Sequence, residues 1–255
     1  MPPIAHLSDL HLGASTAHVH ACVALVERLL ELEQHHVIVS GDITHSGRID
    51  EYETFMTLFA PLRRARRLTV VPGNHDRAGD DVASLLSDGL RVSVDTRPGL
   101  YLVCIDSTAP HNRSAWRSHG HLCAKTVDAV DRALDLAPRG SLVTVVLHHH
   151  LVRLPIEGFG EWFADTVGWP HAQELGLGKQ LLQRVVGRAD LVLHGHRHVP
   201  RHFSIEGPRP LQVFNAGSST ELRAFRTFEL GAAPTWHAVS PHGTPQTPRA
   251  ELRVA

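Results

Sequence analysis

Residues 68–76 read LTVVPGNHD, an apolar run followed by three polar side chains that can bind a metal ion. The run Leu68–Val71 has the composition and length of a buried strand. Asn74, His75 and Asp76 come shortly after it. In an open α/β sheet, loops from distant parts of the chain meet beyond the carboxyl ends of the strands. The stretch therefore predicts an α/β fold with a site at that end of a sheet.

The same pattern recurs at four other places along the chain. The further apolar runs are Pro3–Leu7, Val37–Ser40, Leu142–Leu147 and Leu191–Leu193. The polar residues that follow them are, in order, Asp9 and His11, Asp42, His148, and His196 and His198. Because each cluster follows a predicted strand, we expect all five clusters to contribute to one site.

Helical patterns lie between these runs. Amphipathic periodicity predicts helices over His18–Gln34, Ile49–Leu62, Asp80–Ser87, Ala124–Leu136 and Gly178–Gly187. After Leu193 the pattern predicts four short strands, Arg201–Glu206, Leu211–Asn215, Arg223–Glu229 and Thr235–Val239, with Gly and Pro turns that leave no room for helices. We expect these strands to form the C-terminal half of a second sheet.

Length and composition indicate one catalytic domain over residues 1–239. Within it, residues 151–177 interrupt the sheet pattern and predict a cap beside the metals. Its aromatic side chains either contact substrate or pack the insertion onto the body; they are Phe159, Trp162, Phe163 and Trp169. Residues 240–255 contain three prolines and predict a poorly ordered tail.

Charge and cysteine content exclude several classes of protein. A formal net charge of −1 argues against a dedicated nucleic-acid binder. Three cysteines at unrelated spacings indicate neither a disulfide framework nor a cysteine-based zinc site. The chain shows no signal-peptide pattern and no run of 18 apolar residues, so we expect a cytoplasmic protein without a membrane partner.

The candidate ligands suit a pair of transition-metal ions. Seven side chains are candidates: Asp9, His11, Asp42, Asn74, His148, His196 and His198. Their oxygen and imidazole donors suit iron, manganese or zinc, and a carboxylate can bridge two cations. Seven ligands are too many for one four-coordinate zinc, so a binuclear centre is the economical interpretation.

The series D-x-H, G-D, G-N-H-D, H and G-H-x-H, from Ser8 to His198, is similar to that of the calcineurin-like metallophosphoesterase superfamily. The resemblance implies a four-layer α/β/β/α sandwich with two facing mixed sheets and the metals at one edge. It also implies that Asp9, His11 and His198 bind one metal, that Asn74, His148 and His196 bind the other, and that Asp42 bridges them. Phosphoesters would then be hydrolysed by a metal-activated hydroxide. Manganese and iron are the favoured metals, with zinc and cobalt as alternatives.

Other residues near these motifs are candidates for chemistry or substrate contact. His75 follows a ligand and would face the leaving group, where it could donate a proton, and Asp76 either orients His75 or serves as a turn or capping carboxylate. In the triplet after Leu147, the family's V-x-x-H spacing from Val145 selects His148 as the ligand. His45, His149 and His150 are candidate substrate contacts, with ordinary loop or pocket-wall roles left open.

Details of the motifs narrow the resemblance. The chain lacks the arginines of Ser/Thr protein phosphatases, has His45 in place of the tyrosine ligand of purple acid phosphatases, and keeps His75 where lipid A pathway pyrophosphatases have arginine. It is most similar to bacterial class III cyclic nucleotide and glycerophosphodiester phosphodiesterases, which share S-D-x-H-x-G, G-D-x-T, P-G-N-H-D and the turn at Asn215–Ser218. We therefore predict a phosphodiesterase acting on a small phosphoester, with a phosphomonoesterase as the alternative. A nuclease or a non-catalytic scaffold is disfavoured, and a homodimer is left open.

Overall fold

The apolar runs that precede the candidate ligands are strands in the computed structural model, which describes residues 3–33, 35–110, 120–151, 175–229 and 233–239. These strands are β1 (Ile4–Leu7), β2 (His36–Ser40), β3 (Leu68–Val71), β6 (Leu142–Val146) and β7 (Leu191–His194). Every residue of β1, β2, β6 and β7 is buried, as expected for strands covered on both faces. The strand predictions at these five places are confirmed.

The strands form two mixed sheets within the described residues. One has five strands in the order β11-β10-β1-β2-β3, with β1, β2 and β3 parallel. The other has six strands in the order β4-β5-β6-β7-β9-β8, with β5, β6, β7 and β9 parallel. The remaining strands are β4 (Val92–Arg97), β5 (Leu100–Ile105), β8 (Arg201–Ile205), β9 (Leu211–Asn215), β10 (Ala224–Phe228) and β11 (Thr235–Ala238).

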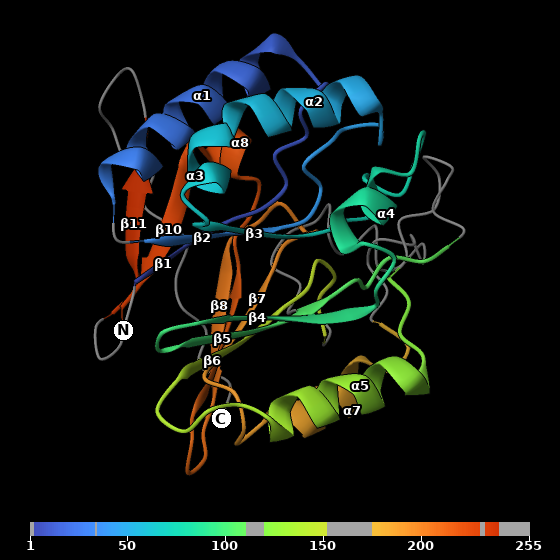
Figure 1. Ribbon diagram of the computed structural model, residues 1–255. Helices are drawn as coiled ribbons and strands as arrows, with labels where there is room; N and C mark the ends of the chain where they lie inside the picture. Colours follow the sequence, from blue (N-terminus) through green and yellow to red (C-terminus); the bar gives the residue numbers. More distant parts are fainter. Residues whose placement is uncertain (1–2, 34, 111–119, 152–174, 230–232, 240–255) are drawn as a thin grey trace, which may run out of the picture.

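Helices cover the outer faces of the two sheets (Figure 1). On one side lie α1 (Thr16–Glu31), α2 (Ile49–Leu58) and α3 (Ala60–Arg64), and on the other α5 (Ala124–Asp135) and α7 (Gly178–Val185). The short helices α4 (Val82–Ser87) and α8 (Ser219–Leu222) complete the described set. The predicted four-layer α/β/β/α sandwich is confirmed.

Three apolar clusters separate the four layers. Strand β2 shows how alternation assigns side chains to them: Val37 and Val39 pack with α1, whereas Ile38 lies between the sheets. The central cluster also contains Val146 of β6 and Leu193 of β7. A third cluster lies between the six-stranded sheet and the helices α5 and α7. Both strands that lead to His148 and His196 are therefore held from two sides.

Several predictions about secondary structure were wrong. The hairpin β4–β5 was not expected at all, although its strands pair from Val92 with Ile105 to Arg97 with Leu100. The four C-terminal strands do not share one sheet: β8 and β9 join the six-stranded sheet, whereas β10 pairs with β1 and β11 with β10. Helix α8 fits between β9 and β10 despite the predicted lack of room.

The predicted helix 49–62 is two helices rather than one. Helix α2 ends at Leu58, and α3 begins at Ala60 with Pro61 in its first turn. Proline has no N–H to continue the hydrogen bonding of a preceding helix. Pro61 therefore accounts for the break between α2 and α3.

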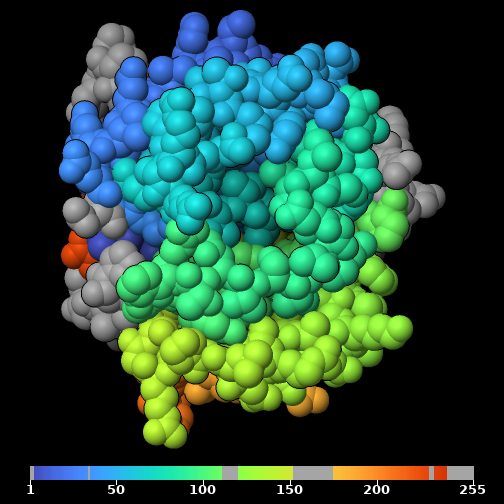
Figure 2. Space-filling model, in the orientation of Figure 1, coloured from blue at the N-terminus to red at the C-terminus, as the bar shows by residue number. Residues whose placement is uncertain are grey.

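The edges of the two sheets meet at β3 and β4. Thr69 donates a hydrogen bond to Asp95 (2.5 Å), and Arg97 donates one to the carbonyl of Arg66 (2.6 Å). Figure 2 shows that the molecule is hollowed on this face, between the cyan segment of α2 and α3 and the green segment of α4 and β4.

Some predictions fall outside the described residues. These include most of the predicted cap, residues 152–174 with all four of its aromatic side chains, and the tail 240–255. Of the described residues at the two ends of the predicted cap 151–177, Leu151 and Leu175 are buried in the apolar cluster beside the six-stranded sheet. No described helix has the length and apolar character needed to cross a membrane. The extent of the domain stays a prediction.

Candidate metal centre

The seven predicted ligands lie together beyond the carboxyl ends of the strands. Asp9 and His11 follow β1, Asp42 follows β2, Asn74 follows β3, His148 follows β6, and His196 and His198 follow β7. The first five strand-end residues, Asp9 to His148, are buried, whereas His196 and His198 are half-buried. Loops from both sheets thus converge, as the alternating pattern predicted.

One group of donor atoms forms around Asp9. The Nε2 atoms of His11 and His198 lie 3.0 Å apart. Asp9 Oδ1 lies 3.4 Å from the His198 nitrogen and 4.0 Å from that of His11. Two imidazoles and a carboxylate therefore face one point.

A second group forms around Asn74. Its Oδ1 lies 3.1 Å from His148 Nε2 and 2.9 Å from His196 Nδ1. An amide oxygen and two imidazole nitrogens therefore face a second point, with ligands drawn from both sheets.

Asp42 lies between the two groups. Its Oδ2 is 3.3 Å from His148 Nε2 and 3.9 Å from His11 Nε2, so one carboxylate oxygen faces both. Ligands held about 2.1 Å from a first-row metal lie roughly 3.0–3.4 Å from one another. The observed spacings, from 2.9 Å between Asn74 and His196 to 4.0 Å between Asp9 and His11, fit this range closely enough for cations to draw the donors together.

The electrostatics of the buried carboxylates favour cations. Burial alone would lower the pKa of His148, but the charge and hydrogen bond of Asp42, together with the charge of Asp9, raise that pKa to about 9. His198 behaves alike: burial opposes its charge, yet the hydrogen bond with Asp9 raises its pKa to about 9. In contrast, burial lowers the pKa of His11 to about 4. Without metal, His148 and His198 therefore each hold an extra proton at neutral pH. The buried carboxylates that stabilise these positive charges would also stabilise metal cations.

The backbone is strained at most of these ligands. Five of the seven have a positive φ: Asp9 (53°), His11 (46°), Asp42 (51°), His196 (77°) and His198 (52°). A left-handed backbone costs a non-glycine residue about 1–2 kcal/mol. Strain of this kind persists where the surrounding structure imposes it, and it clusters at functional sites.

Glycines before the ligands allow loops to approach closely. A Cβ on Gly73 would overlap the Asp42 carboxylate, and one on Gly195 would overlap the side chains of Ser8 and Asp9. The glycines of G-N-H-D and G-H-x-H are thus needed because another chain segment occupies the space of a side chain.

Asp76 does not orient His75, contrary to one of the two roles considered for it. Its buried carboxylate accepts hydrogen bonds from the N–H groups of Gly73 (2.8 Å), Ile43 (3.3 Å) and Thr44 (2.9 Å), and from the Thr44 hydroxyl (2.7 Å). It therefore ties the loop after β3 to the loop after β2. Burial, together with the charge of Asp42, raises the pKa of Asp76 to about 6.

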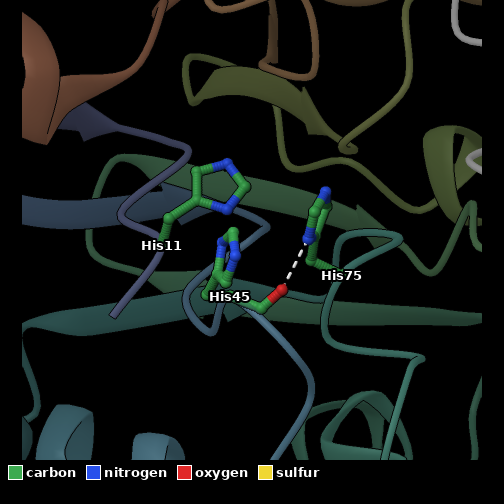
Figure 3. Close-up of side chains that lie close together, drawn as sticks. All are labelled: His11, His45 and His75. Carbon is green, nitrogen blue, oxygen red and sulfur yellow. Dashed lines mark hydrogen bonds between the residues drawn. The ribbon is translucent and has the colours of Figure 1, made fainter. Parts of the chain in front are cut away.

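The ring of His75 is instead held by a backbone carbonyl (Figure 3). Its Nδ1 lies 2.6 Å from the carbonyl oxygen of His45, and since a carbonyl only accepts, Nδ1 carries the proton. The ring stands edge-on to His11 with centroids 4.7 Å apart, and the exposed ring of His45 lies 5.8 Å from that of His11. Ring nitrogens of the three histidines lie within 4.8 Å of one another. Both His45 and His75 thus border the first donor group.

The other candidate substrate contacts, His149 and His150, are buried beside the second donor group. The ring of His149 packs at 4.7 Å from His196, and that of His150 stacks at 5.9 Å from the same residue. Their roles in substrate contact stay predictions.

The sequence analysis missed one polar cluster at a strand end. Asp106, Ser107 and Thr108 follow β5 and are buried. The signal was present in the apolar run Leu100–Ile105, which ends in a carboxylate like the others. Arg77, also buried, pairs with Asp106 at 2.6 Å.

Comparisons with known proteins show which family and fold the chain is similar to. The family model for calcineurin-like phosphoesterases matches residues 2–200. A curated relative, the 3′,5′-cyclic adenosine monophosphate phosphodiesterase CpdA of Pseudomonas aeruginosa, is 32% identical over 185 residues. That match covers 68% of this chain but only 62% of the relative, less than two thirds of its length.

Solved structures share the fold at low sequence identity. A dimetal phosphatase from Danio rerio superposes with a TM-score of 0.65 at 12% identity, covering 93% of this chain and 99% of that one. The phosphopantetheinyl hydrolase of Mycobacterium tuberculosis gives 0.52 at 17% identity, covering 96% and 99%.

Proposed function

Since this chain belongs to the calcineurin-like phosphoesterase family, we propose that it hydrolyses small phosphodiesters, cyclic nucleotides among them, at a binuclear metal centre. The observation that carries the proposal is the placement of Asp42 Oδ2 toward both donor groups. The similarity to a cyclic adenosine monophosphate phosphodiesterase supports a diester as the substrate class.

The residues present would hold two ions with few adjustments. Asp9, His11 and His198 would bind one ion, Asn74, His148 and His196 the other, and Asp42 both. Bound ions would polarise phosphoryl oxygens and lower the pKa of a shared water. Mixed oxygen and imidazole ligands favour manganese or iron, with zinc and cobalt as alternatives.

In this proposal, His75 exchanges a proton with the leaving group. Because its Nδ1 donates to the His45 carbonyl, Nε2 is the ring atom that can meet a substrate oxygen. The backbone N–H of His75 donates to Asp42 Oδ1 at 2.8 Å, which fixes the residue relative to the shared carboxylate. Protonation of a departing alkoxide would therefore occur beside the donor groups.

Metal-restored protein tests the proposal directly. Metal-free protein is loaded with manganese, the bound metal is counted, and hydrolysis of bis(p-nitrophenyl) phosphate, p-nitrophenyl phosphate and cyclic adenosine monophosphate is compared. We expect two ions per chain and faster diester than monoester turnover. The Asn74→Ala variant should lose one ion and most turnover, whereas the remote Asp190→Asn variant should keep both.

Other outcomes decide against parts of the proposal. Faster monoester turnover would make the protein a phosphomonoesterase, and full activity of Asn74→Ala would remove Asn74 from the centre.

A further inference from the structure

The Asp106–Thr108 segment follows β5 and lies at the same end of the six-stranded sheet as two candidate ligand loops. Strand β5 runs parallel to β6, and β6 parallel to β7, so their carboxyl ends share one edge. All three side chains of the segment are buried, with exposed fractions of 5%, 0% and 0%. Buried polar groups need partners, and the partners of this segment lead to the second donor group.

One arm of contacts runs through Arg77 to Asn74. The Arg77 guanidinium donates to Asp106 Oδ2 at 2.6 Å and to the Thr108 hydroxyl at 2.9 Å. Thr108 in turn donates to Asp106 Oδ1 through its N–H (3.0 Å) and its hydroxyl (2.6 Å). The N–H of Arg77 donates to the carbonyl of Asn74 at 3.3 Å and closes the turn that presents Asn74. The position of Asn74 therefore depends on where Asp106 holds Arg77.

The other arm runs through Ser107 to the two histidines. The Ser107 hydroxyl accepts the N–H of His149 at 3.3 Å and lies 2.9 Å from that residue's Nδ1. The His149 ring packs edge-on against His148 at 5.0 Å and lies tilted against His196 at 4.7 Å. Ser107 thus holds the ring that packs against both imidazoles of the second donor group.

We propose that the Asp106–Thr108 segment positions the second metal's ligands, Asn74, His148 and His196, by holding Arg77 and His149 at fixed distances. The inference rests on the proposed binuclear centre and deepens it. In the part of the chain that the structure describes, the side chains of Asp106, Ser107 and Thr108 contact Arg77 and His149, and Asp106 also pairs with Arg91 at 3.4 Å. None of these contacts reaches Asp9, His11 or His198 directly. The segment should therefore act more strongly on the second metal than on the first, which it reaches only through the N–H of His196 bound to Asp9.

The charge pair makes this arrangement sensitive to a small change. Arg77 also donates to Asp81 and Ser84 at 2.9 Å each, so with a neutral residue 106 the pull of Asp81 beside α4 would be opposed only by the neutral Thr108 hydroxyl and residue 106. The turn that carries Asn74 would shift with Arg77, because the Arg77 N–H is bound to the Asn74 carbonyl. Loss of groups that orient metal ligands typically lowers metal affinity about 10–100-fold.

The test compares Asp106→Asn with Asp190→Asn, a matched control. Asp190 pairs with Arg209 at 2.7 Å and accepts the Val143 N–H at 2.8 Å, at the opposite ends of β6 and β7. Manganese titration of metal-free protein should give two ions for the wild type and the control. In Asp106→Asn, the affinity for one ion should fall about 10–100-fold while that for the other is kept.

Electron paramagnetic resonance reports the same change independently of activity. A spin-coupled manganese pair should be replaced by the six-line signal of an isolated ion when Asp106→Asn is titrated at the concentration that saturates the wild type. Ser107→Ala removes only the hydroxyl that holds His149. It should lower the affinity for the same ion by about 10-fold. It decides the matter if Asp106→Asn does not fold.

Two results would overturn the inference. Wild-type affinity for both ions in Ser107→Ala and in folded Asp106→Asn would show that the segment does not position ligands. Equal metal loss in Asp190→Asn would show a general effect of destabilisation. A wild type that binds a single ion would instead overturn the binuclear centre, which is a distinguishable outcome.

Discussion

Replacing Gly73 with alanine should disable the centre through a single methyl group. A Cβ at this position would lie 2.1 Å from Asp42 Oδ1, and real side-chain carbons essentially never come closer than 3.0 Å. The carboxylate oxygen must therefore retreat by about 0.9 Å, the difference between these two distances. The Cβ would also lie 2.3 Å from the backbone nitrogen of Asp42, so the loop that carries Asp42 must move as well. Gly73 does not have a positive φ, so the effect comes from this overlap and not from backbone strain.

A displacement of that size is large for a metal ligand. Ligand distances are defined to about 0.2 Å, and a 1 Å misplacement near a reacting centre costs roughly 100-fold in rate. Overpacking of this kind also lowers the free energy of unfolding by about 1–3 kcal/mol. We expect Gly73→Ala to bind fewer than two ions and to hydrolyse bis(p-nitrophenyl) phosphate about 100-fold more slowly than the wild type.

The matched control is Gly207→Ala, where an added Cβ would meet nothing closer than 3.9 Å. Metal content, turnover and urea unfolding are measured on both variants. If Gly73→Ala keeps two ions and turns over within about threefold of the control, the close approach of the two loops does not govern the geometry of Asp42, and the reasoning is refuted.

Three further predictions follow from the electrostatics and hydrogen bonds of the site. The pKa values of His148 and His198, raised to about 9 without metal, exceed the ordinary 6.5, so their stabilising protonation is complete below pH 6.5 and lost as pH rises through 9. The melting temperature of metal-free protein should accordingly fall over that range more steeply than that of metal-loaded protein in scanning calorimetry; parallel curves would contradict this. His75→Ala should keep both metals but slow alkyl phosphodiesters about 10²–10⁴-fold and nitrophenyl esters much less; equal losses in parallel kinetic assays would point to another role. Asp76→Asn should lower the free energy of unfolding in urea by about 2–3 kcal/mol, because an amide cannot satisfy all four donors; an unchanged value would show that these bonds contribute nothing net.

The sequence predicted the strands and the convergence of ligands because both follow from local patterns. A short apolar run of three to six residues marks each of the five strands that precede the ligands, and parallel strands bring their following loops together whatever lies between. His11 and His198 meet in the structure although their positions in the sequence differ by 187. The pairing of these motifs into one centre therefore needed only the order of the strands.

Other features depend on contacts that no local pattern contains. Strand β10 pairs with β1 through Ile4 and Phe228, at opposite ends of the described chain, and its residues look no different from those of β9. The hairpin β4–β5 was within reach, because Val92–Arg97 alternates and Pro98-Gly99 is a turn signal. Overlooking it also hid Asp106.

The role of Asp76 shows why residues that support a site are harder to predict than its ligands. A carboxylate after a histidine suggests a partner for that ring, yet its acceptors are used by the N–H groups of Ile43 and Thr44, about thirty residues away. Backbone donors are present at every residue except proline, so the sequence carries no mark of which ones a carboxylate will meet.

The strained ligands indicate that the protein, rather than the metal, imposes the shape of the centre. Left-handed conformations at Asp9 and Asp42 cost free energy, so other contacts must stabilise them. The carbonyl of Asp9 accepts a hydrogen bond from the Ser218 hydroxyl at 3.0 Å, its N–H donates to the carbonyl of Gly41 at 3.0 Å, and Asp76 holds the loop that carries Asp42. These contacts are made by backbone groups and supporting side chains. The ligand atoms of the two donor groups therefore stay available for a cation. Because the cost of arranging the ligands is met during folding, the proposed ions could bind without reorganising the loops, and this would favour their binding at a fixed separation.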